Sequence, residues 1–473
     1  MPTISPSFIK GLRQSKLDYR NNLPVNMTAV IEEVKGDEGY LLTHDGLVRF
    51  ADVAGTARGG VYNERLTEHF RVSGTSLQTI GTDGTATTIG AIAGTGVASF
   101  ANSFNTQAIV ADGMMYLWDG ATLTRIRDPD LGVPIDITWF RGIYVMTDGE
   151  SLIQTDITDE YSISPLKFTS SEFAADPIKA VARNDQNQIL AFNRYSIEYF
   201  FFNANAPADV SVLQNIPGKA TKIGIVGTHC QVEMSGVFFI LGGRREAGVS
   251  VHAFSGGSAR EVANREIYKI INKYTEAQLE NAVLEARVHE GYEFLYVHLP
   301  CETLIYNHTV GKTAGASNAW SYVVTESPDQ TDDDFSWRGR FGVFDPRLGD
   351  WIYGDTKQGL VGRLDNTIAS QYGNPTECIC YTPIIPLEQR SITQFEIDTI
   401  PGFSSSDVNC SFSISYDGTI YGKEWSGLAS RSGNYNTRYI ARPREYVRDM
   451  FSMKFRFTSD DKMAFSGLDI EYV

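Results

Sequence analysis

The sequence predicts an all-β protein, namely a degenerate β-propeller with a small helical insertion and a C-terminal antiparallel β-sandwich. Aromatic residues make up 12% of the 473 residues, and 43 glycines stand beside only 17 prolines. This composition favours strands and tight turns over long helices or disorder. Short apolar runs bounded by turn residues recur along most of the chain, and the alternation of apolar and polar residues becomes cleaner past about Thr376. Since the chain is long for one ordinary core, we expect two main domains.

The stretch from Ile109 to Ile126, IVADGMMYLWDGATLTRI, shows the repeated unit of the first domain. Its apolar runs end at Asp112-Gly113 and at Asp119-Gly120, and its last run alternates apolar and polar residues. Asp-Gly supplies two residues that tolerate positive φ, as a type I′ turn requires. The stretch therefore predicts three antiparallel strands joined by tight turns.

Similar aromatic and β-branched runs recur along the chain and begin near Val61, Ile143, Ile189, Val237, Tyr292 and Gly342. With the stretch that begins at Ile109 included, their starts are roughly 33 to 55 residues apart, and a propeller blade takes about 40 to 50. Further turns are expected at Asp45-Gly46, Asp83-Gly84 and Asp148-Gly149. A propeller with blades alike in shape but not in sequence explains this spacing, and unrelated hairpins in two sandwiches are the alternative.

We expect three parts, with residues 1–22 as an extended N-terminal arm, 23–375 as the propeller-like domain and 376–473 as the β-sandwich. The arm is too polar to form its own core. Four basic residues of the arm are candidates for partner binding: Lys10, Arg13, Lys16 and Arg20. The alternative is that they belong to a frayed basic tail. The N-terminus has no apolar core of a secretory signal, and no stretch approaches 18 apolar residues, so we expect no membrane anchor.

The helical insertion is expected near residues 261–287. Ile267, Ile270, Ile271 and Tyr274 recur at helical spacing, and Asn264 can cap the start. A second helix is expected to begin at Thr275, which forms a T-x-x-Q capping box with Gln278. It is expected to continue through Leu279, Val283 and Ala286.

The last hundred residues predict half-buried strands. Cys410, Phe412 and Ile414 lie on one face of a strand, opposite three serines. A second strand places on its apolar face Phe451, Met453, Phe455 and Phe457. Its polar face carries Ser452, Lys454 and Arg456. We interpret both as strands of an antiparallel sandwich.

The net charge of the chain, 41 − 57 = −16, excludes general binding of nucleic acid. The C-terminal domain nevertheless has a basic and aromatic cluster whose arginines are candidate partner-binding residues: Arg438, Arg442, Arg444 and Arg448. Such a cluster suits an acidic partner or DNA phosphates, and a solvated sandwich face is the alternative.

The sequence predicts no catalytic residue, no metal site and no cofactor. It contains no G-x-S-x-G elbow, H-E-x-x-H helix or P-loop. The seven histidines are scattered, and the five cysteines include no C-x-x-C pair. Cys378 and Cys380 fit simple packing better than metal binding. The segment 415–425, SYDGTIYGKEW, is like the structural Asp box of sialidase propellers but lacks its spacer, so a glycan-degrading propeller enzyme is one alternative function and a non-viral interaction module another.

Several short stretches, taken in order, resemble the packaged-DNA stabilisation proteins, also described as tail hubs or tail accessory factors, of short-tailed phages that carry a tail needle. The stretches are LPVNM (23–27), ARGGVYN (57–63), IAGTGVASFA (92–101), DITWFRGIY (136–144), SIEYF (196–200), KIGIVGTHC (222–230), IYKIINKYTEAQ (267–278), YVHLPCETLIYN (296–307) and SQYG (370–373). They are spread over most of the chain and are sparsest in the last hundred residues.

The resemblance implies a structural protein of the virion tail, assembled in the host cytoplasm. Its expected partners are further copies in a homo-hexameric ring, the head-to-tail adaptor protein below the portal, the tail needle, the tailspike and the packaged double-stranded DNA in the channel. The acidic charge fits this expectation, because a channel wall of like charge lets DNA pass without binding it.

Overall fold

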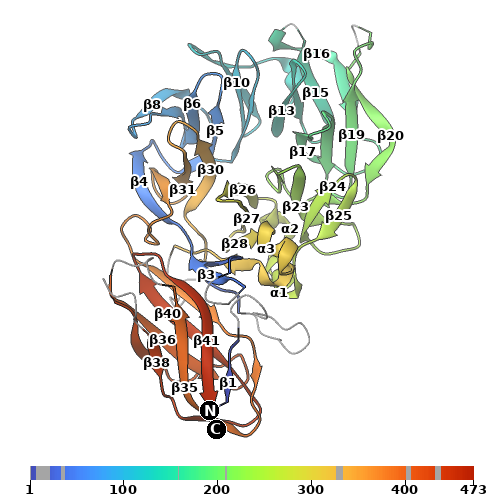
Figure 1. The fold of residues 1–473 in the computed structure, drawn as a ribbon. Helices are drawn as coiled ribbons and strands as arrows, with labels where there is room; N and C mark the ends of the chain where they lie inside the picture. Colours follow the sequence, from blue (N-terminus) through green and yellow to red (C-terminus); the bar gives the residue numbers. More distant parts are fainter. Residues whose placement is uncertain are drawn as a thin grey trace. The chain divides into compact units, whose positions relative to one another are not determined.

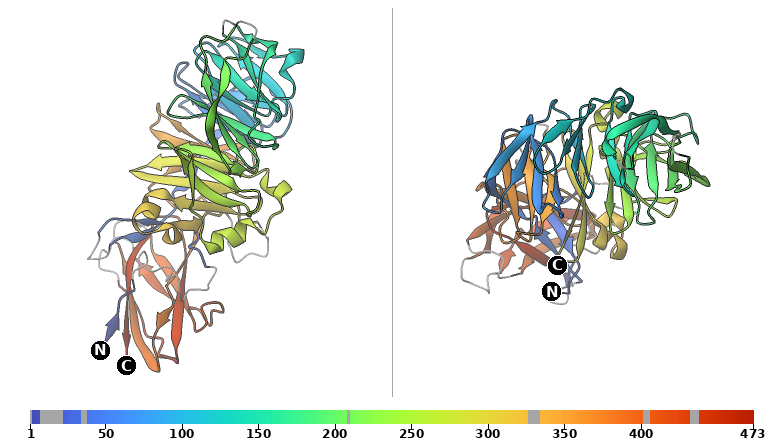
Figure 2. Two further views of the ribbon diagram at one scale, coloured as in Figure 1. Left: turned by 90° about the vertical axis from the view of Figure 1, so that its right-hand side faces the viewer. Right: turned by 90° about the horizontal axis from the view of Figure 1, so that it is seen from above.

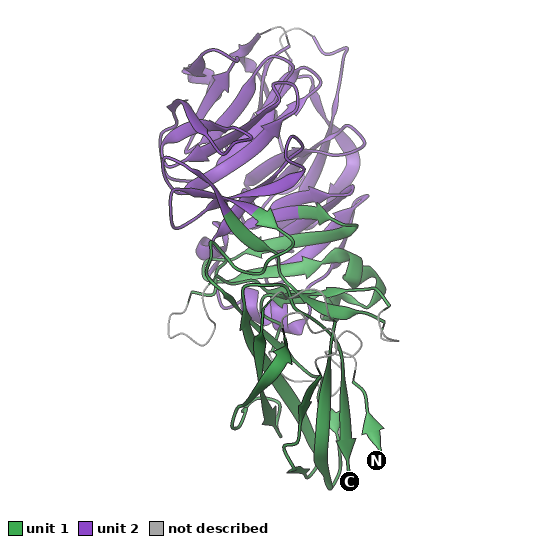
Figure 3. Cartoon of the chain, turned by 60° about the vertical axis from the view of Figure 1, so that its left-hand side comes forward, with its two compact units in different colours: residues 1–48, 287–337, 364–473 green, residues 49–286, 338–363 purple. Residues whose placement is uncertain are grey.

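The computed structural model describes residues 2–6, 22–33, 38–157, 159–207, 210–325, 334–400, 406–431 and 438–473. The chain forms two compact units, of which unit 1 contains residues 1–48, 287–337 and 364–473, and unit 2 contains residues 49–286 and 338–363 (Figure 3). The limits between the units fall within the strands β4 (Gly46–Asp52), β26 (Val283–His289) and β32 (Leu360–Asp365). The domain limits expected from the sequence remain predictions.

The first five sheets of unit 2 are each built from strands that follow one another in the chain. The first contains β5 (Ala57–Asn63), β6 (Glu68–Ser73), β7 (Ser76–Ile80) and β8 (Ala86–Ala91). The second contains β9 (Ala98–Asn102), β10 (Gln107–Ala111), β11 (Met114–Trp118) and β12 (Leu123–Arg125). The third contains β13 (Asp136–Phe140), β14 (Ile143–Thr147), β15 (Ser151–Asp156) and β16 (Asp159–Ser170).

The fourth sheet contains β17 (Ile178–Arg183), β18 (Ile189–Asn193), β19 (Ile197–Phe202) and β20 (Leu213–Thr221). The fifth contains β21 (Gly224–Ile225), β22 (Gln231–Met234), β23 (Val237–Gly243), β24 (Ser250–Ser255) and β25 (Ser258–Glu261). Another sheet joins β26 to β27 (Tyr292–His298), β28 (Thr303–Asn307) and β29 (Trp320–Tyr322). The last joins β30 (Gly339–Asp345), β31 (Asp350–Asp355) and β32 to β4. The described residues thus contain seven such sheets, a number that the sequence pattern left open.

The sheets of unit 2 are arranged like propeller blades. The first strand of each sheet lies beside the first strand of the next, in the order β5, β9, β13 and β17, and β30 lies beside β5. Figures 1 and 2 show these sheets following one another in chain order, from blue to green. Because β4 precedes β5 in the chain yet completes the sheet of β30 to β32, the start and end of the propeller segment share one sheet. The predicted fold class is confirmed.

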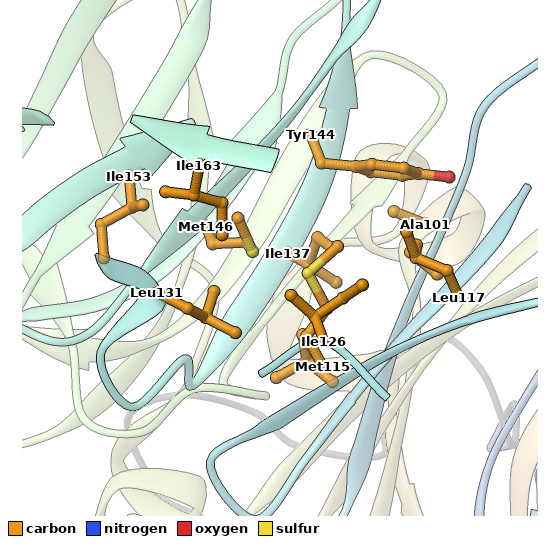
Figure 4. Close-up of a cluster of buried hydrophobic side chains, with 12 residues drawn as sticks. Ala101, Met115, Leu117, Ile126, Leu131, Ile137, Tyr144, Met146, Ile153 and Ile163 are labelled. Carbon is orange, nitrogen blue, oxygen red and sulfur yellow. The ribbon is translucent and has the colours of Figure 1, made fainter. Parts of the chain in front are cut away.

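Apolar clusters fill the space between neighbouring sheets. One cluster combines Met115 and Leu117 of β11 with Ile137 of β13 and Tyr144 and Met146 of β14 (Figure 4). All five side chains are buried, and their strands belong to two different sheets. A single meander cannot bury its apolar face alone, so each sheet depends on its neighbours for its core.

The turn predictions were correct at Asp112-Gly113 and only partly so elsewhere. Asp112 and Gly113 both have positive φ, 46° and 76°, and join β10 to β11. At Asp119, by contrast, the side chain accepts hydrogen bonds from the backbone N–H groups of Ala121 and Thr122, which gives a longer loop. Asp45-Gly46 is not a hairpin turn, because it joins β3 (Tyr40–Thr43) to β4, and these strands belong to different sheets.

The helical insertion is shorter than predicted. Asn264 caps α1 (Arg265–Ile271) as expected, since its side chain accepts from Ile267 N. The helix ends before Tyr274, because the Asn272 side chain donates to the carbonyls of Tyr268 and Val249. Gln278 accepts from Thr275 N at the start of α2 (Glu276–Leu279).

The prediction that the second helix continues through Val283 and Ala286 was wrong. Val283–His289 forms strand β26, which pairs with β27 and buries Val283 and Leu284. A third helix, α3 (His308–Thr313), and the 3-10 turns η1 (Pro129–Leu131) and η2 (Ala316–Asn318) were not predicted. No helix among the described residues is long and apolar enough to cross a membrane.

Unit 1 contains the two sheets of the sandwich. One contains β1 (Thr3–Ile4), β2 (Met27–Val30), β3, β35 (Arg390–Thr399), β38 (Tyr439–Ala441), β39 (Glu445–Val447) and β41 (Ala464–Tyr472). The other contains β33 (Thr376–Tyr381), β34 (Ile385–Pro386), β36 (Val408–Ser415), β37 (Trp425–Ser430) and β40 (Met450–Ser459). Strand β1 pairs with β41 of its own chain, and the two chain ends lie side by side in Figures 1 and 2.

The predicted apolar faces of β36 and β40 are confirmed, because Cys410, Phe412, Ile414 and the four predicted apolar residues of β40 are all buried. The polar faces are less exposed than expected, since Ser413, Ser415 and Ser452 are also buried. Ser452 donates to the carbonyl of Thr382, so the chain after β33 covers this part of the sheet. The sequence pattern could not show this cover, because it comes from a distant segment.

Candidate functional site

The predicted partner-binding residues fall into two groups, and the structure describes only one. Lys10, Arg13, Lys16 and Arg20 lie outside the described residues. Arg438, Arg442, Arg444 and Arg448 are described and exposed. The analysis of the predicted docking face therefore concerns the C-terminal group.

Arg438 and Arg442 flank β38 and reach over the neighbouring strand β35. Arg438 forms a forked hydrogen-bonded ion pair with the carboxylate of Glu396, and Arg442 Nε donates to Gln394 Oε1 at 2.9 Å. The register places Glu396 opposite Ile440, so the pair forms across the strands. The bond with Glu396 raises the pKa of Arg438. Two of the four predicted residues therefore lie on one sheet, but with acidic and amide partners.

Arg444 and Arg448 lie in the turns before and after β39. Arg444 has a φ of 54°, the left-handed conformation of a turn, and Arg448 Nε lies 3.8 Å from Asp449 Oδ2. Tyr446 of β39 is 58% exposed between them. The predicted basic cluster is thus a mixed surface of arginines, carboxylates and one exposed aromatic ring, which suits a partner with charges of both signs.

A buried ionic cluster in unit 1 was not predicted. Asp45 pairs with Arg287 of β26 and with Lys462, whose Nζ lies 2.5 Å from Asp45 Oδ1. The side chains of Arg287 and Lys462 are each 3% exposed. Lys462 Nζ also donates to the carbonyl of Thr43 at 2.8 Å. One carboxylate therefore holds two cations from segments more than 170 residues apart in the sequence, Arg287 and Lys462.

The electrostatics of this cluster follow from burial and charge. Burial alone would raise the pKa of Asp45, but Arg287 and Lys462 outweigh it and hold that pKa well below its usual range. Burial lowers the pKa of Lys462 and, more strongly, that of the adjacent His44, which falls to about 3. His44 is therefore neutral at pH 7, and its Nε2 lies 2.9 Å from the hydroxyl of Tyr296.

Aromatic rings enclose the cluster. The His44 ring meets that of Trp337 edge-on with centroids 5.3 Å apart, and Tyr296 stacks on Trp337 at 5.4 Å. Trp337 and Tyr296 are fully buried. Because the side chains of Asp45, Arg287 and Lys462 are largely buried, the attraction between the carboxylate and its two cations is screened less than at the surface.

No group of histidine, cysteine and acidic side chains in the described residues could hold a metal ion. Cys378, Cys380 and Cys410 are buried, and burial raises their pKa, that of Cys410 to about 12. Thiols of this kind stay protonated and pack as small apolar groups. Asp417, in the segment compared with an Asp box, accepts bonds from the backbone N–H groups of Thr419 and Ile420 and so forms a turn.

We predict that Asp45→Asn strongly destabilises the protein, because it removes the carboxylate between two buried cations while keeping the side-chain shape. The expected loss is about 3–5 kcal/mol in free energy of unfolding, measured by urea denaturation. The control is Asp52→Asn, which removes the exposed ion pair with Arg49 and should cost less than about 1 kcal/mol. Equal effects of the two variants would show that the buried cluster contributes little.

As the pH falls, the protein should lose stability before the pH reaches the usual pKa range of carboxyl groups. The pKa of His44 is lowered by burial, so the unfolded state takes up a proton below about pH 6.5 that the folded state takes up only near pH 3. Stability is then lost as pH falls, by up to about 1.4 kcal/mol per pH unit for one histidine. Below about pH 4, Asp45 adds to the loss, because its folded pKa is depressed.

The measurement is the midpoint of thermal unfolding between pH 7 and pH 4. His44→Gln should flatten the decline without abolishing it, because burial also lowers the pKa of His69, to about 4. His289→Gln, at a partly exposed histidine, serves as the control. If the unfolding midpoint of His44→Gln falls with pH as steeply as that of the unchanged protein, His44 does not contribute to the acid destabilisation.

Comparisons with known proteins agree with this geometry. Residues 5–369 match the family described as bacteriophage P22 Gp10, beta-propeller, and residues 377–473 match the family described as bacteriophage P22 Gp10, beta-sandwich. A relative, the tail hub protein gp10 of Salmonella phage P22, is 26% identical over 488 aligned residues, which cover 99% of each chain.

Solved structures show weaker likeness. Virginiamycin B lyase from Staphylococcus aureus has a TM-score of 0.43 and 10% identity and covers 69% of this chain and 99% of its own. The WD40 domain of Neurospora crassa Pan2 has a TM-score of 0.41 and 12% identity and covers 68% of this chain and 95% of its own. These scores are too low to carry an argument about function. The family matches, in contrast, cover both predicted domains, and the chain belongs to the bacteriophage P22 Gp10 family as a structural, non-enzymatic tail hub protein of the virion tail.

Proposed function

We propose that this tail hub protein forms a ring, expected to be a hexamer, below the portal and the head-to-tail adaptor protein. In this position it retains the packaged DNA, receives the tail needle and provides part of the surface on which tailspikes dock. The observation that carries the proposal is the end-to-end match with the P22 tail hub protein, which covers 99% of both chains. The match spans both the propeller and the sandwich families.

The charge of the chain supports a position beside the DNA channel. The net charge of −16 repels the duplex and allows it to pass at ejection, whereas a basic wall would bind it. DNA retention would then depend on physical closure by the ring and the needle. The proposed adaptor, needle and tailspike contacts use the exposed mixed-charge surface at Arg438, Arg442, Arg444 and Arg448, together with the N-terminal residues 1–22.

The outer strand of the third sheet supports ring formation. Leu166 and Phe168 of β16 are 60% and 58% exposed, and Phe173, just after the strand, is 46% exposed. Exposed apolar side chains clustered on an edge strand are usually covered by another chain. A closed ring of identical subunits would cover such an edge in each copy.

The first test is DNA retention. DNA-filled phage heads that lack this protein should lose their genome to added nuclease, and purified protein added before the nuclease should restore protection. The readout is the amount of full-length DNA after nuclease treatment, with heat-unfolded protein as the control. Full protection of heads without this protein would refute genome retention and would leave only an attachment role.

The second test concerns the mixed-charge surface. Arg438→Glu combined with Arg442→Glu and Arg444→Glu should impair assembly of the hub on the tail, because three of the four arginines of this surface then become acidic beside Glu396. Assembly is measured as the fraction of hub protein that sediments with filled heads.

The matched control is the double variant Arg438→Glu with Glu396→Arg. It keeps an ion pair across the strands but swaps the positions of the positive and negative charges. If docking needs the arginine itself, the exchange fails to assemble. If the pair only stabilises the sheet, the exchange restores assembly. Normal assembly of the triple variant would show that this surface is simply solvated.

A further inference from the structure

One pocket of unit 2 lies where the inner strands of five successive sheets end. Its volume is about 730 Å3, in the range of pockets that hold small ligands. Its lining comes from the carboxyl ends of β5, β9, β13 and β17 and from β22 with the start of β23. Because the inner strands run side by side, their ends gather residues that lie far apart in the sequence.

Six polar side chains of this pocket are not used by the fold, whereas Ser103 Oγ accepts from the backbone N–H groups of Asn105 and Thr106. Glu64, Arg65, Asn102, Thr138, Gln231 and Glu233 line it, and within the described part of the chain their side chains form no hydrogen bond or ion pair. Burial raises the pKa of Glu233, the nearby Asp185 carboxylate adds to the rise, and the Arg183 guanidinium opposes it. Polar groups of both donor and acceptor type therefore face the same cavity.

Aromatic side chains form the other part of the wall. Phe104, 70% exposed in the loop after β9, meets the ring of Trp139 edge-on with centroids 5.1 Å apart. Phe100 and Phe238 also line the pocket. An exposed phenylalanine beside a half-buried tryptophan offers an apolar surface for a ligand with a flat C–H face.

We propose that this pocket binds a short neutral saccharide. Hydroxyl groups both donate and accept, so they can pair with the carboxylates, amides and guanidinium groups together, while the C–H face of a sugar ring packs on Phe104 and Trp139. The two acidic and two basic side chains, Glu64, Glu233, Arg65 and Arg183, cancel in formal charge. In a chain of net charge −16, this leaves no excess of positive charge to attract an anion.

An extended peptide fits the pocket less well. Peptides of this kind add a strand to an open sheet edge through main-chain hydrogen bonds, but this pocket is lined by the ends of strands. The saccharide site goes beyond the proposed tail hub function and does not rest on it, so either proposal can fail without the other.

The test uses the purified full chain on a printed array of neutral oligosaccharides built from glucose, galactose, mannose and rhamnose, with uronic-acid oligosaccharides on the same slide. We expect retention of at least one neutral series, and competition by the same saccharide free in solution at about 1 mM, the range of weak specific binding. Retention of only the acidic series, or of none, would overturn the proposal.

Variants locate the site. Phe104→Ala and Arg183→Ala, both at exposed positions, should each weaken binding about tenfold, the ratio that 1.4 kcal/mol gives. Phe201→Ala, at an exposed phenylalanine of β19 outside the pocket lining, should bind like the unchanged protein. Thermal unfolding checks that each variant is folded. Unchanged binding in both pocket variants would show that the saccharide binds elsewhere and would refute this site. Binding to an immobilised peptide library that is lost in Phe104→Ala would show that the pocket binds a peptide instead of a saccharide.

Discussion

The contact between Asp45, Arg287 and Lys462 fixes the arrangement of unit 1. These residues come from the N-terminal segment, from a strand in the middle of the chain and from the connection between the last two strands of the sandwich. Two buried cations without a carboxylate between them would carry a large desolvation cost. The three segments therefore have to fold together, and the low exposure of Arg287 and Lys462, 3% each, makes the requirement stricter.

The N-terminal segment has a similar role along its whole described length in unit 1. Val25 forms bridges with both Ile379 and Tyr322, and the side chain of Asn26 bonds to the backbone of Val324 and Glu377. Strands β2 and β3 then extend the sheet that contains β41. A short segment of the N-terminus thus supplies hydrogen bonds that would otherwise be missing at the edges of later strands.

In unit 2, the arrangement of the sheets depends on the burial of apolar side chains. Each sheet buries its face against the next, as the cluster of Met115, Ile137 and Tyr144 shows, and β4 joins the sheet of β30 to β32 so that the series closes on itself. The ends of the inner strands bring side chains from five sheets to one pocket. Closure of the fold therefore produces a pocket without any local sequence signal for it.

The sequence by itself determined the features that depend on local chemistry. Alternation predicted the buried face of β36 and β40, Asp112-Gly113 predicted a tight turn, Asn264 predicted a helix start, and ordered short stretches identified the family. These succeed because turn dihedrals, caps and face alternation are set within a few residues.

Only the tertiary structure decided the features that need distant partners. It assigned Val283–His289 to a strand by pairing with β27, buried Ser413 and Ser452 under a distant segment, paired Arg438 with Glu396 and made Asp45 an ionic centre instead of a turn residue. The physical reason is the same in each case, since sheet pairing and charge burial depend on residues that the local pattern does not contain.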